Sequence, residues 1–414
     1  MDLIVPPTPG QQNEGPAEPR GRPRTDVPRL ERIRRRKRAR RIRTAAVCVL
    51  VLAGILAYFT GLFGTSIALL GDVFDGVTVA FTPGDGFPAE FKLSGFLEAQ
   101  PFAGGVVAVG EQDMAMISSK GTEYYRIQHN YTRPCITVGN TRVCIYNRAG
   151  TQLRVESRGR SLFENTFQDP ILLCAMSPNG TLAVFTKGLL TVYDPLFTQI
   201  FSFKTSELPT AMAFAADNKQ FAVGAPYAEN GALGGTVYLF TTDPDAPAEA
   251  TATIRNTEGL PLRIEYLTKN EVLVFYDTFA AAYNTADGAE LARYDYRGRT
   301  LQSAAVADGK NSVAALFGDG THSSQTQLVV LDRQLAELGS ADVGRIAKGV
   351  CATRTGVYVL TGESVLSYGL DGTALGEQLA EGRVLDLVPG KKLYLLTQGR
   401  MEVFDPPAPP VASS

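Results

Sequence analysis

The chain has 414 residues, 44% of them hydrophobic, with a formal net charge of −2, two histidines and no tryptophan. A single hydrophobic core is strained at this length, so a repeat array or several domains is expected. Two histidines exclude a histidine-rich metal site and leave little material for a Ser-His-Asp triad.

Charge is divided unevenly along the chain. Residues 1–44 carry 13 Lys or Arg against 5 Asp or Glu, while residues 45–414 carry 27 against 37. Residues 1–28 are rich in Pro, Gly, Gln and Glu, a composition typical of disorder. Arg29–Arg43 is a basic run, for which binding to anionic lipid headgroups is favoured over binding to nucleic acid. Residues 1–44 are therefore predicted to be a disordered, basic cytoplasmic tail.

An uncharged stretch follows at Ala45–Gly64 (AAVCVLVLAGILAYFTGLFG). A helix of about twenty apolar residues spans a bilayer core. The positive-inside rule then places the basic run in the cytoplasm and everything after Gly64 outside the cell. A cleaved signal peptide with a weak site at Ser66–Ala68 is the alternative, but the long basic segment favours an uncleaved anchor. The prediction is a single-pass protein of the cell membrane.

Two cysteines flank a candidate hairpin turn in PCITVGNTRVCIY. If Gly139-Asn140 is a two-residue turn, Cys135 faces Cys144 at a non-hydrogen-bonded pair, where side chains approach closely. That spacing suits a disulfide, and the compartment outside the cell is oxidising enough for one to form. Two reduced thiols packed side by side are the alternative.

A pattern of polar turns and short apolar strands recurs from residue 96 to residue 404. Ser177–Gly180 precedes TLAVFT and LLTVYD, and Asp217–Lys219 precedes QFAVGA and GTVYLF. Matching turns lie 35 to 52 residues apart, which suits one four-stranded propeller blade each. The units begin near Phe96, Asn130, Pro170, Pro209, Pro261, Leu301, Arg345 and Arg383. The prediction is an all-β, eight-bladed β-propeller preceded by one transmembrane helix, with seven blades as the alternative.

The last unit lacks a fourth strand. Residues 65–95 are predicted to be a linker that supplies it, from either Val77–Phe81 or Glu90–Leu93, because closing the ring removes both open sheet edges. Residues 405–414 (DPPAPPVASS) are predicted to be a disordered, Pro-rich tail.

Two connections between the second and third strands of a unit are long: Ala225–Gly235 in unit four and Gly318–Gln325 in unit six. Both are expected on the same face of the propeller, and long loops on a rigid scaffold are where binding usually occurs. Tolerated surface insertion is the alternative. The candidate binding residues are Tyr227, Glu229, Asn230, Asp319, Thr321 and His322.

Catalytic motifs are absent from the sequence. It contains no G-x-S-x-G, no H-E-x-x-H and no P-loop. No catalytic residue, metal ligand or cofactor is therefore predicted, and the protein is not expected to be an enzyme.

Two stretches, Glu123–Ser157 and Leu172–Asp194, resemble a family of single-pass membrane proteins of Gram-positive bacteria that is known only as a domain of unknown function. Leu153-Arg154-Val155 and the Ser177-Pro178-Asn179-Gly180 turn carry most of the similarity. The resemblance implies an N-terminal anchor and an external, WD40-like propeller. It implies no activity, cofactor or catalytic residue.

The function predicted from these features is that of a binding or scaffolding module at the cell envelope, whose partner is a protein or an envelope polymer. The first alternative is an enzyme that uses paired carboxylates on envelope glycan or lipid. The second is a sensor that couples an external ligand to the basic tail.

Overall fold

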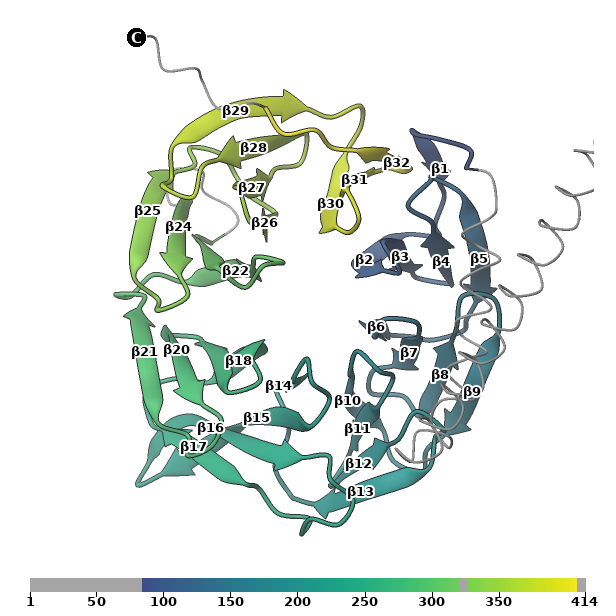
Figure 1. Ribbon diagram of the computed structural model, residues 1–414. Helices are drawn as coiled ribbons and strands as arrows, with labels where there is room; N and C mark the ends of the chain where they lie inside the picture. Colours follow the sequence, from purple (N-terminus) through teal and green to yellow (C-terminus); the bar gives the residue numbers. More distant parts are fainter. Residues whose placement is uncertain (1–83, 320–325, 408–414) are drawn as a thin grey trace, which may run out of the picture. The chain divides into compact units, whose positions relative to one another are not determined.

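The computed structural model describes residues 84–319 and 326–407, and every regular element in them is a β-strand (Figure 1). The strands form eight antiparallel sheets of four strands each, arranged as the blades of a ring. The eight-bladed propeller is therefore confirmed, and the seven-bladed alternative is wrong.

In each of the first four blades the strands follow one another from the inner to the outer edge. They are β2 (Phe96–Phe102), β3 (Gly105–Gly110), β4 (Asp113–Ile117) and β5 (Glu123–Gln128) in blade 1; β6 (Pro134–Val138), β7 (Val143–Asn147), β8 (Gln152–Glu156) and β9 (Ser161–Thr166) in blade 2; β10 (Ile171–Met176), β11 (Leu182–Thr186), β12 (Leu189–Tyr193) and β13 (Gln199–Lys204) in blade 3; and β14 (Ala211–Phe214), β15 (Gln220–Glu229), β16 (Ala232–Thr241) and β17 (Ala252–Asn256) in blade 4.

Blades 5 to 7 repeat this order, and blade 8 combines both ends of the described chain. The strands are β18 (Pro261–Thr268), β19 (Glu271–Tyr276), β20 (Phe279–Asn284) and β21 (Glu290–Asp295) in blade 5; β22 (Leu301–Val306), β23 (Ser312–Phe317), β24 (Gln327–Asp332) and β25 (Glu337–Asp342) in blade 6; β26 (Gly349–Ala352), β27 (Val357–Leu360), β28 (Ser364–Tyr368) and β29 (Ala374–Leu379) in blade 7; and β30 (Val384–Pro389), β31 (Leu393–Thr397), β32 (Gly399–Val403) and β1 (Ala89–Phe91) in blade 8.

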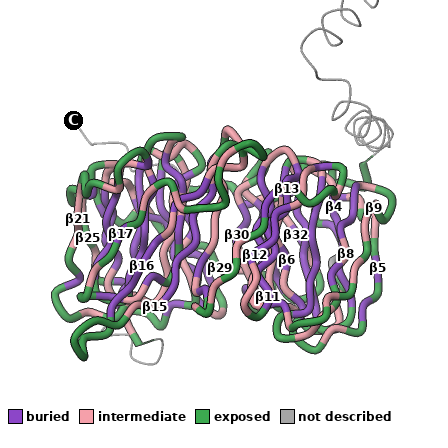
Figure 2. The backbone as a smooth tube through the Cα atoms, turned by 90° about the horizontal axis from the view of Figure 1, so that it is seen from below, coloured by how far each residue is buried: buried purple, intermediate pink, exposed green. Residues whose placement is uncertain are grey.

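The core lies between the blades. Eight apolar clusters are found in the described residues, one at each contact between neighbouring sheets. Between blades 3 and 4, for example, the ring of Phe201 meets those of Phe221 and Phe240 edge-on at 5.7 and 5.5 Å. The second and third strands have both faces covered, so they read as continuous apolar runs, whereas outer strands such as β5 have mixed burial (Figure 2).

The ring is closed by a strand from the N-terminal side of the repeats. β1 pairs antiparallel with β32, with Glu90 opposite Arg400. This confirms the prediction that the segment before the first unit supplies the missing strand, at the second of the two predicted places; Val77–Phe81 lies outside the described residues. The Tyr394 hydroxyl reinforces the seam by donating a 3.0 Å hydrogen bond to the carbonyl of Gly104 in blade 1.

The predicted disulfide is wrong. Cys135 and Cys144 are free thiols, and the register of β6 and β7 explains why. Cys135 pairs with Tyr146 and Cys144 pairs with Thr137, so the two cysteines are offset by two residues. The turn is centred one residue later than predicted, on Asn140-Thr141.

Contacts with the next blade set this register. The backbone N–H of Asn140 donates a 3.0 Å hydrogen bond to the carbonyl of Pro178. The side chain of Arg142 is only 2% exposed, because its guanidinium donates to the carbonyl of Pro195 and lies 5.4 Å from the ring centre of Phe197. The turn is therefore positioned by blade 3, which the local sequence of the hairpin does not reveal.

Within the described residues, no helix is both long and apolar enough to cross a membrane. The predicted tail at residues 1–44, the predicted span at Ala45–Gly64 and most of the C-terminal tail at residues 405–414 lie outside the described residues.

Candidate functional site

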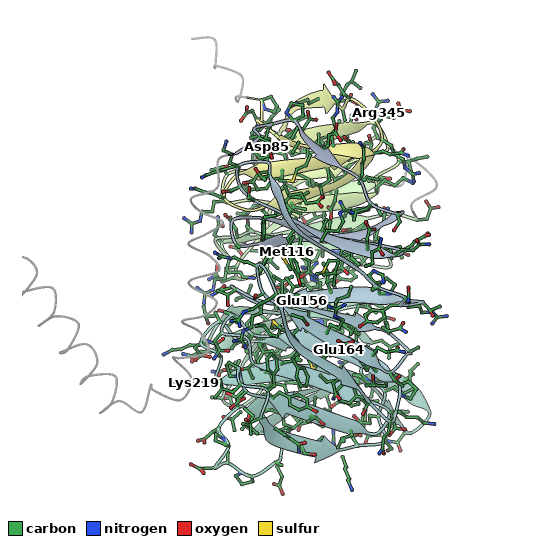
Figure 3. All side chains as sticks on the ribbon, turned by 90° about the vertical axis from the view of Figure 1, so that its right-hand side faces the viewer. Asp85, Met116, Glu156, Glu164, Lys219 and Arg345 are labelled. Carbon is green, nitrogen blue, oxygen red and sulfur yellow. The ribbon has the colours of Figure 1, made fainter. Side chains whose placement is uncertain are left out.

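One face of the propeller carries the connections between second and third strands and those between blades. We call it the hairpin face, because the β15–β16 hairpin extends from it (Figure 2, lower left). The described chain begins at Gly84 and ends at Pro407 on the opposite face, since β1 and β32 run antiparallel. Figure 3 places Asp85 and Lys219 towards this opposite face and Arg345 towards the hairpin face.

The segment predicted as a long loop in unit four is a β-hairpin. β15 and β16 have ten residues each and stay paired up to Glu229 and Ala232. The turn residues Asn230 and Gly231 have φ angles of 50° and 81°, as a two-residue type I′ turn requires. The Asn-Gly dipeptide is the sequence signal that identifies this hairpin. A paired hairpin thus replaces the predicted long loop.

The candidate residues on this arm differ in accessibility. Tyr227 is half-buried, with the guanidinium of Arg255 5.1 Å from its ring centre, whereas Glu229 and Asn230 are exposed at the tip. In unit six, Asp319 is exposed, and Thr321 and His322 lie outside the described residues. The structure therefore brings together the three residues of the hairpin.

A polar groove of about 520 Å³ runs beside the hairpin, between blades 4 and 5. Tyr227 and Glu229 form one side of it, and Arg293 forms the other. Arg293 is held by an ion pair with Glu258 and by a 2.8 Å ion pair with Asp295, so its charge is already compensated.

Exposed apolar side chains concentrate on the hairpin face. Of the nine large hydrophobic residues that are exposed in the described part of the chain, six lie on that face by their place in the topology. These six are Leu97, Leu208, Leu233, Leu262, Ile346 and Leu379. Leu233, 61% exposed, is on the hairpin itself, one pair before the turn. Single exposed leucines are ordinary on a protein surface and form no contiguous apolar patch by themselves.

The central channel has a volume of about 790 Å³ and is lined by the inner strands of all eight blades. Two carboxylates face it from neighbouring blades, Glu98 in β2 and Asp386 in β30. Burial raises the pKa of Asp386 to about 6, and the Glu98 charge adds to that rise. Burial also raises the pKa of Glu98, although Gln100 donates a 2.6 Å hydrogen bond to it. Sequence reasoning missed this pair because its members are 288 positions apart.

The other side of the channel is internally neutralised. Glu265 accepts a 2.7 Å ion pair from Arg263 and a 3.1 Å ion pair from Lys310. Of the titratable groups in the channel, the carboxylates Glu98 and Asp386 have no basic partner among the described residues.

The other groups that could do chemistry are buried parts of the fold. His129 is 6% exposed, burial lowers its pKa, and its Nδ1 accepts a 3.4 Å hydrogen bond from the backbone N–H of Tyr131. Burial raises the pKa of the Cys351 thiol to about 12, which disfavours the nucleophilic thiolate. Within the part of the chain that the structure describes, no three His, Cys, Asp or Glu side chains are grouped so that they could hold a metal ion.

The Asp386 carboxyl predicts a dependence of stability on pH. Its folded pKa, about 6, lies above the usual value of 3.8, so the folded state favours the protonated form. The contribution of Asp386 to the free energy of unfolding is therefore fully present below pH 4 and is lost as the pH rises through 6. The loss is about 2 kcal/mol once the partial exposure of the carboxyl is allowed for. Urea unfolding at pH 4 and pH 7.5 should therefore show that Asp386→Asn gains stability over the wild type only at the higher pH. A gain of equal size at both pH values would contradict the assignment.

Residues 90–405 match the model of a family described as a family of unknown function, DUF5711. No curated protein matches the sequence. BamB from Moraxella catarrhalis has a similar fold, with a TM-score of 0.55 at 14% identity over 76% of this chain and 98% of BamB. Chaetomium thermophilum Sqt1, solved bound to the N-terminus of ribosomal protein L10, gives 0.56 at 14% identity over 78% and 100%. Kluyveromyces lactis Hsv2 gives 0.51 at 8% identity over 69% and 98%. Identities this low show a shared propeller fold alone.

Proposed function

Because this chain belongs to the DUF5711 family of unknown function, we propose its role from its own surface: it is a binding or scaffolding module at the cell envelope. Its partner is a protein or an envelope polymer that docks on the hairpin face. The β15–β16 hairpin carries the proposal, since it is the feature by which blade 4 departs from the other blades.

The build of the hairpin favours recognition through side chains. The carbonyl of Gly224 in β15 points towards the β14 side of the strand, where it accepts a 2.8 Å hydrogen bond from the backbone N–H of Thr210. The backbone groups of Pro226, two residues later, point to the same side, where β14 no longer pairs with β15 and the strand edge is free. Proline has no N–H to offer there, which discourages strand addition by another chain. The exposed groups left for a partner are the side chains of Glu229, Asn230 and Leu233.

We further propose that Ala45–Gly64 anchors the chain in the cell membrane, with Arg29–Arg43 near anionic lipid in the cytoplasm and the propeller outside. The described residues begin on the face opposite the hairpin. Sqt1 supports a protein partner as the ligand class, since it is a propeller solved with a bound protein segment. Protease protection of the tail in intact cells tests the topology.

The hairpin tip provides the functional prediction. Glu229→Ala combined with Leu233→Ala is expected to weaken partner capture roughly ten-fold, because truncating central contacts of an interface costs 1 kcal/mol or more each. Proximity labelling of the intact membrane protein identifies the partner, and co-purification with each variant measures its capture.

Glu249→Ala is the matched control, because Glu249 is exposed on the same blade but belongs to a connection on the opposite face. It should capture the partner as the wild type does. Unchanged capture by the hairpin variant, or equal loss in both variants, would contradict the proposed docking face.

The carboxylate pair in the channel favours one alternative, an enzyme acting on envelope glycan or lipid. Glycoside hydrolysis needs two carboxyl groups, one of them with a raised pKa. Glu98 and Asp386 are two such carboxyl groups, and burial raises the pKa of both. We favour binding, and propose that the protein is not an enzyme. Release of soluble fragments from envelope preparations, lost in Glu98→Gln, would reverse that preference.

A further inference from the structure

A basic pocket opens on the hairpin face at the seam between blades 8 and 1. Its volume is about 550 Å³, and its charged lining residues are Lys92, Lys348 and Arg383. No carboxylate is among the described residues that line it. This contrasts with the chain after residue 44, in which Asp and Glu outnumber Lys and Arg by 37 to 27.

Ring closure assembles the pocket from distant parts of the sequence. Lys92 follows the closing strand β1, while Lys348 and Arg383 each come immediately before the inner strand of a blade. Inner strands begin on the hairpin face, so the three cationic side chains reach the same depression.

The pairing of these cations distinguishes them from their neighbours. Arg345 forms a 3.1 Å ion pair with Glu377, and Arg400 pairs with Glu381, so both are compensated. Lys92 pairs with Glu90 at 2.7 Å, although both side chains are largely exposed and water screens the interaction. Lys348 and Arg383 have no acidic partner within 4 Å among the described residues.

We propose that this pocket binds an oxyanion, with a phosphate group as the best chemical match. The Arg383 guanidinium offers a planar pair of donors that suits phosphate oxygens, and the two lysines add compact positive charges. A carboxylate ligand would balance only one of the three positive charges in the pocket. A phosphate monoester carries close to two negative charges and would balance more of them. The phosphate comes either from a free phosphate compound or from a phosphodiester in a larger molecule, whose single negative charge would balance the three cations less completely.

The test uses the full-length protein in detergent and isothermal titration with sodium pyrophosphate at low ionic strength. Lys348→Gln combined with Arg383→Gln is expected to raise the dissociation constant at least about ten-fold, because two charge-assisted contacts are lost. Both side chains are exposed, so folding should be unaffected. Titration with glycerophosphoglycerol in parallel distinguishes the sources: binding of this diester that the double variant weakens assigns a phosphodiester ligand, and its absence assigns a free phosphate compound.

Lys187→Gln is the control, since Lys187 is an exposed cation on the hairpin face of blade 3, away from the pocket. The absence of pyrophosphate binding by the wild type, unchanged binding by the double variant, or an equal loss in Lys187→Gln would overturn the proposal. The hairpin variant should bind pyrophosphate normally, so this site stands or fails independently of the proposed protein partner.

Discussion

Replacing residues 85–93 of the full chain with a Gly-Ser linker of equal length is expected to cost about 3–5 kcal/mol of stability. The replacement removes β1, which is the outer strand of blade 8, and with it the buried side chain of Ala89. It also removes Phe87 and Leu93, which pack against the apolar cluster between blades 1 and 8. β32 would then present an unpaired edge, so self-association should increase.

Guanidinium unfolding and light scattering after gel filtration measure the two effects. A synthetic peptide covering residues 84–94 should restore part of the lost stability in trans, and a scrambled peptide should not. Unfolding midpoints that agree between the linker variant and the wild type would show that the eight blades hold together without the closing strand.

Tyr394→Ala is expected to cost about 3–5 kcal/mol, whereas Tyr394→Phe should cost about 1 kcal/mol. Tyr394 is fully buried at the same seam, its ring stacks on that of Phe87 at 5.7 Å, and its hydroxyl is bonded to the carbonyl of Gly104. The alanine variant leaves a cavity and loses the hydroxyl's hydrogen bond, but the phenylalanine variant loses only that bond, since the Gly104 carbonyl still accepts a 3.0 Å hydrogen bond from the backbone N–H of Lys391.

Chemical unfolding of both variants at pH 7.5 separates these contributions. Equal losses would show that the hydrogen bond outweighs the packing of the ring. A loss below 1 kcal/mol in Tyr394→Ala would show that the seam repacks around the missing side chain.

The two predictions and the basic pocket concern one seam, where the ring is joined by the pairing of its two ends. Lys92 and Arg383 come from segments that flank this join. The linker variant, which also removes Lys92 from the pocket, should therefore bind pyrophosphate more weakly, while the polar groove between blades 4 and 5 would keep its shape.

The repeat was predictable from the sequence because each blade is a local unit. Runs such as TLAVFT and LLTVYD are buried on both faces by the neighbouring blades, so they are mostly apolar and are separated by short polar turns. Those features depend on residues within some fifty positions of one another, and they indicated eight units, their approximate starts and the missing fourth strand.

The errors arose where contacts between blades decide the local structure. The β6–β7 turn is shifted because Asn140 and Arg142 bind groups of blade 3, so the pairing of Cys135 with Cys144 was predicted in the wrong register. In blade 4, Asn230-Gly231 was interpreted as part of a loop. Its positive φ angles instead form a tight turn, so β15 and β16 stay paired over ten residues each.

The sequence by itself determined the all-β propeller, the approximate starts of its units and the missing fourth strand of the last one, because hydrophobic periodicity and turn chemistry act over short distances. The tertiary structure decided between eight blades and seven, and between the two candidate closing segments. Only the tertiary structure decided which side chains meet. The channel carboxylates Glu98 and Asp386, and the cations Lys92, Lys348 and Arg383, are far apart in the sequence and become neighbours when the ring closes. Ring closure brings together side chains at the same level of neighbouring blades, and which of them share a pocket depends on packing between blades, which the spacing of the repeat does not show.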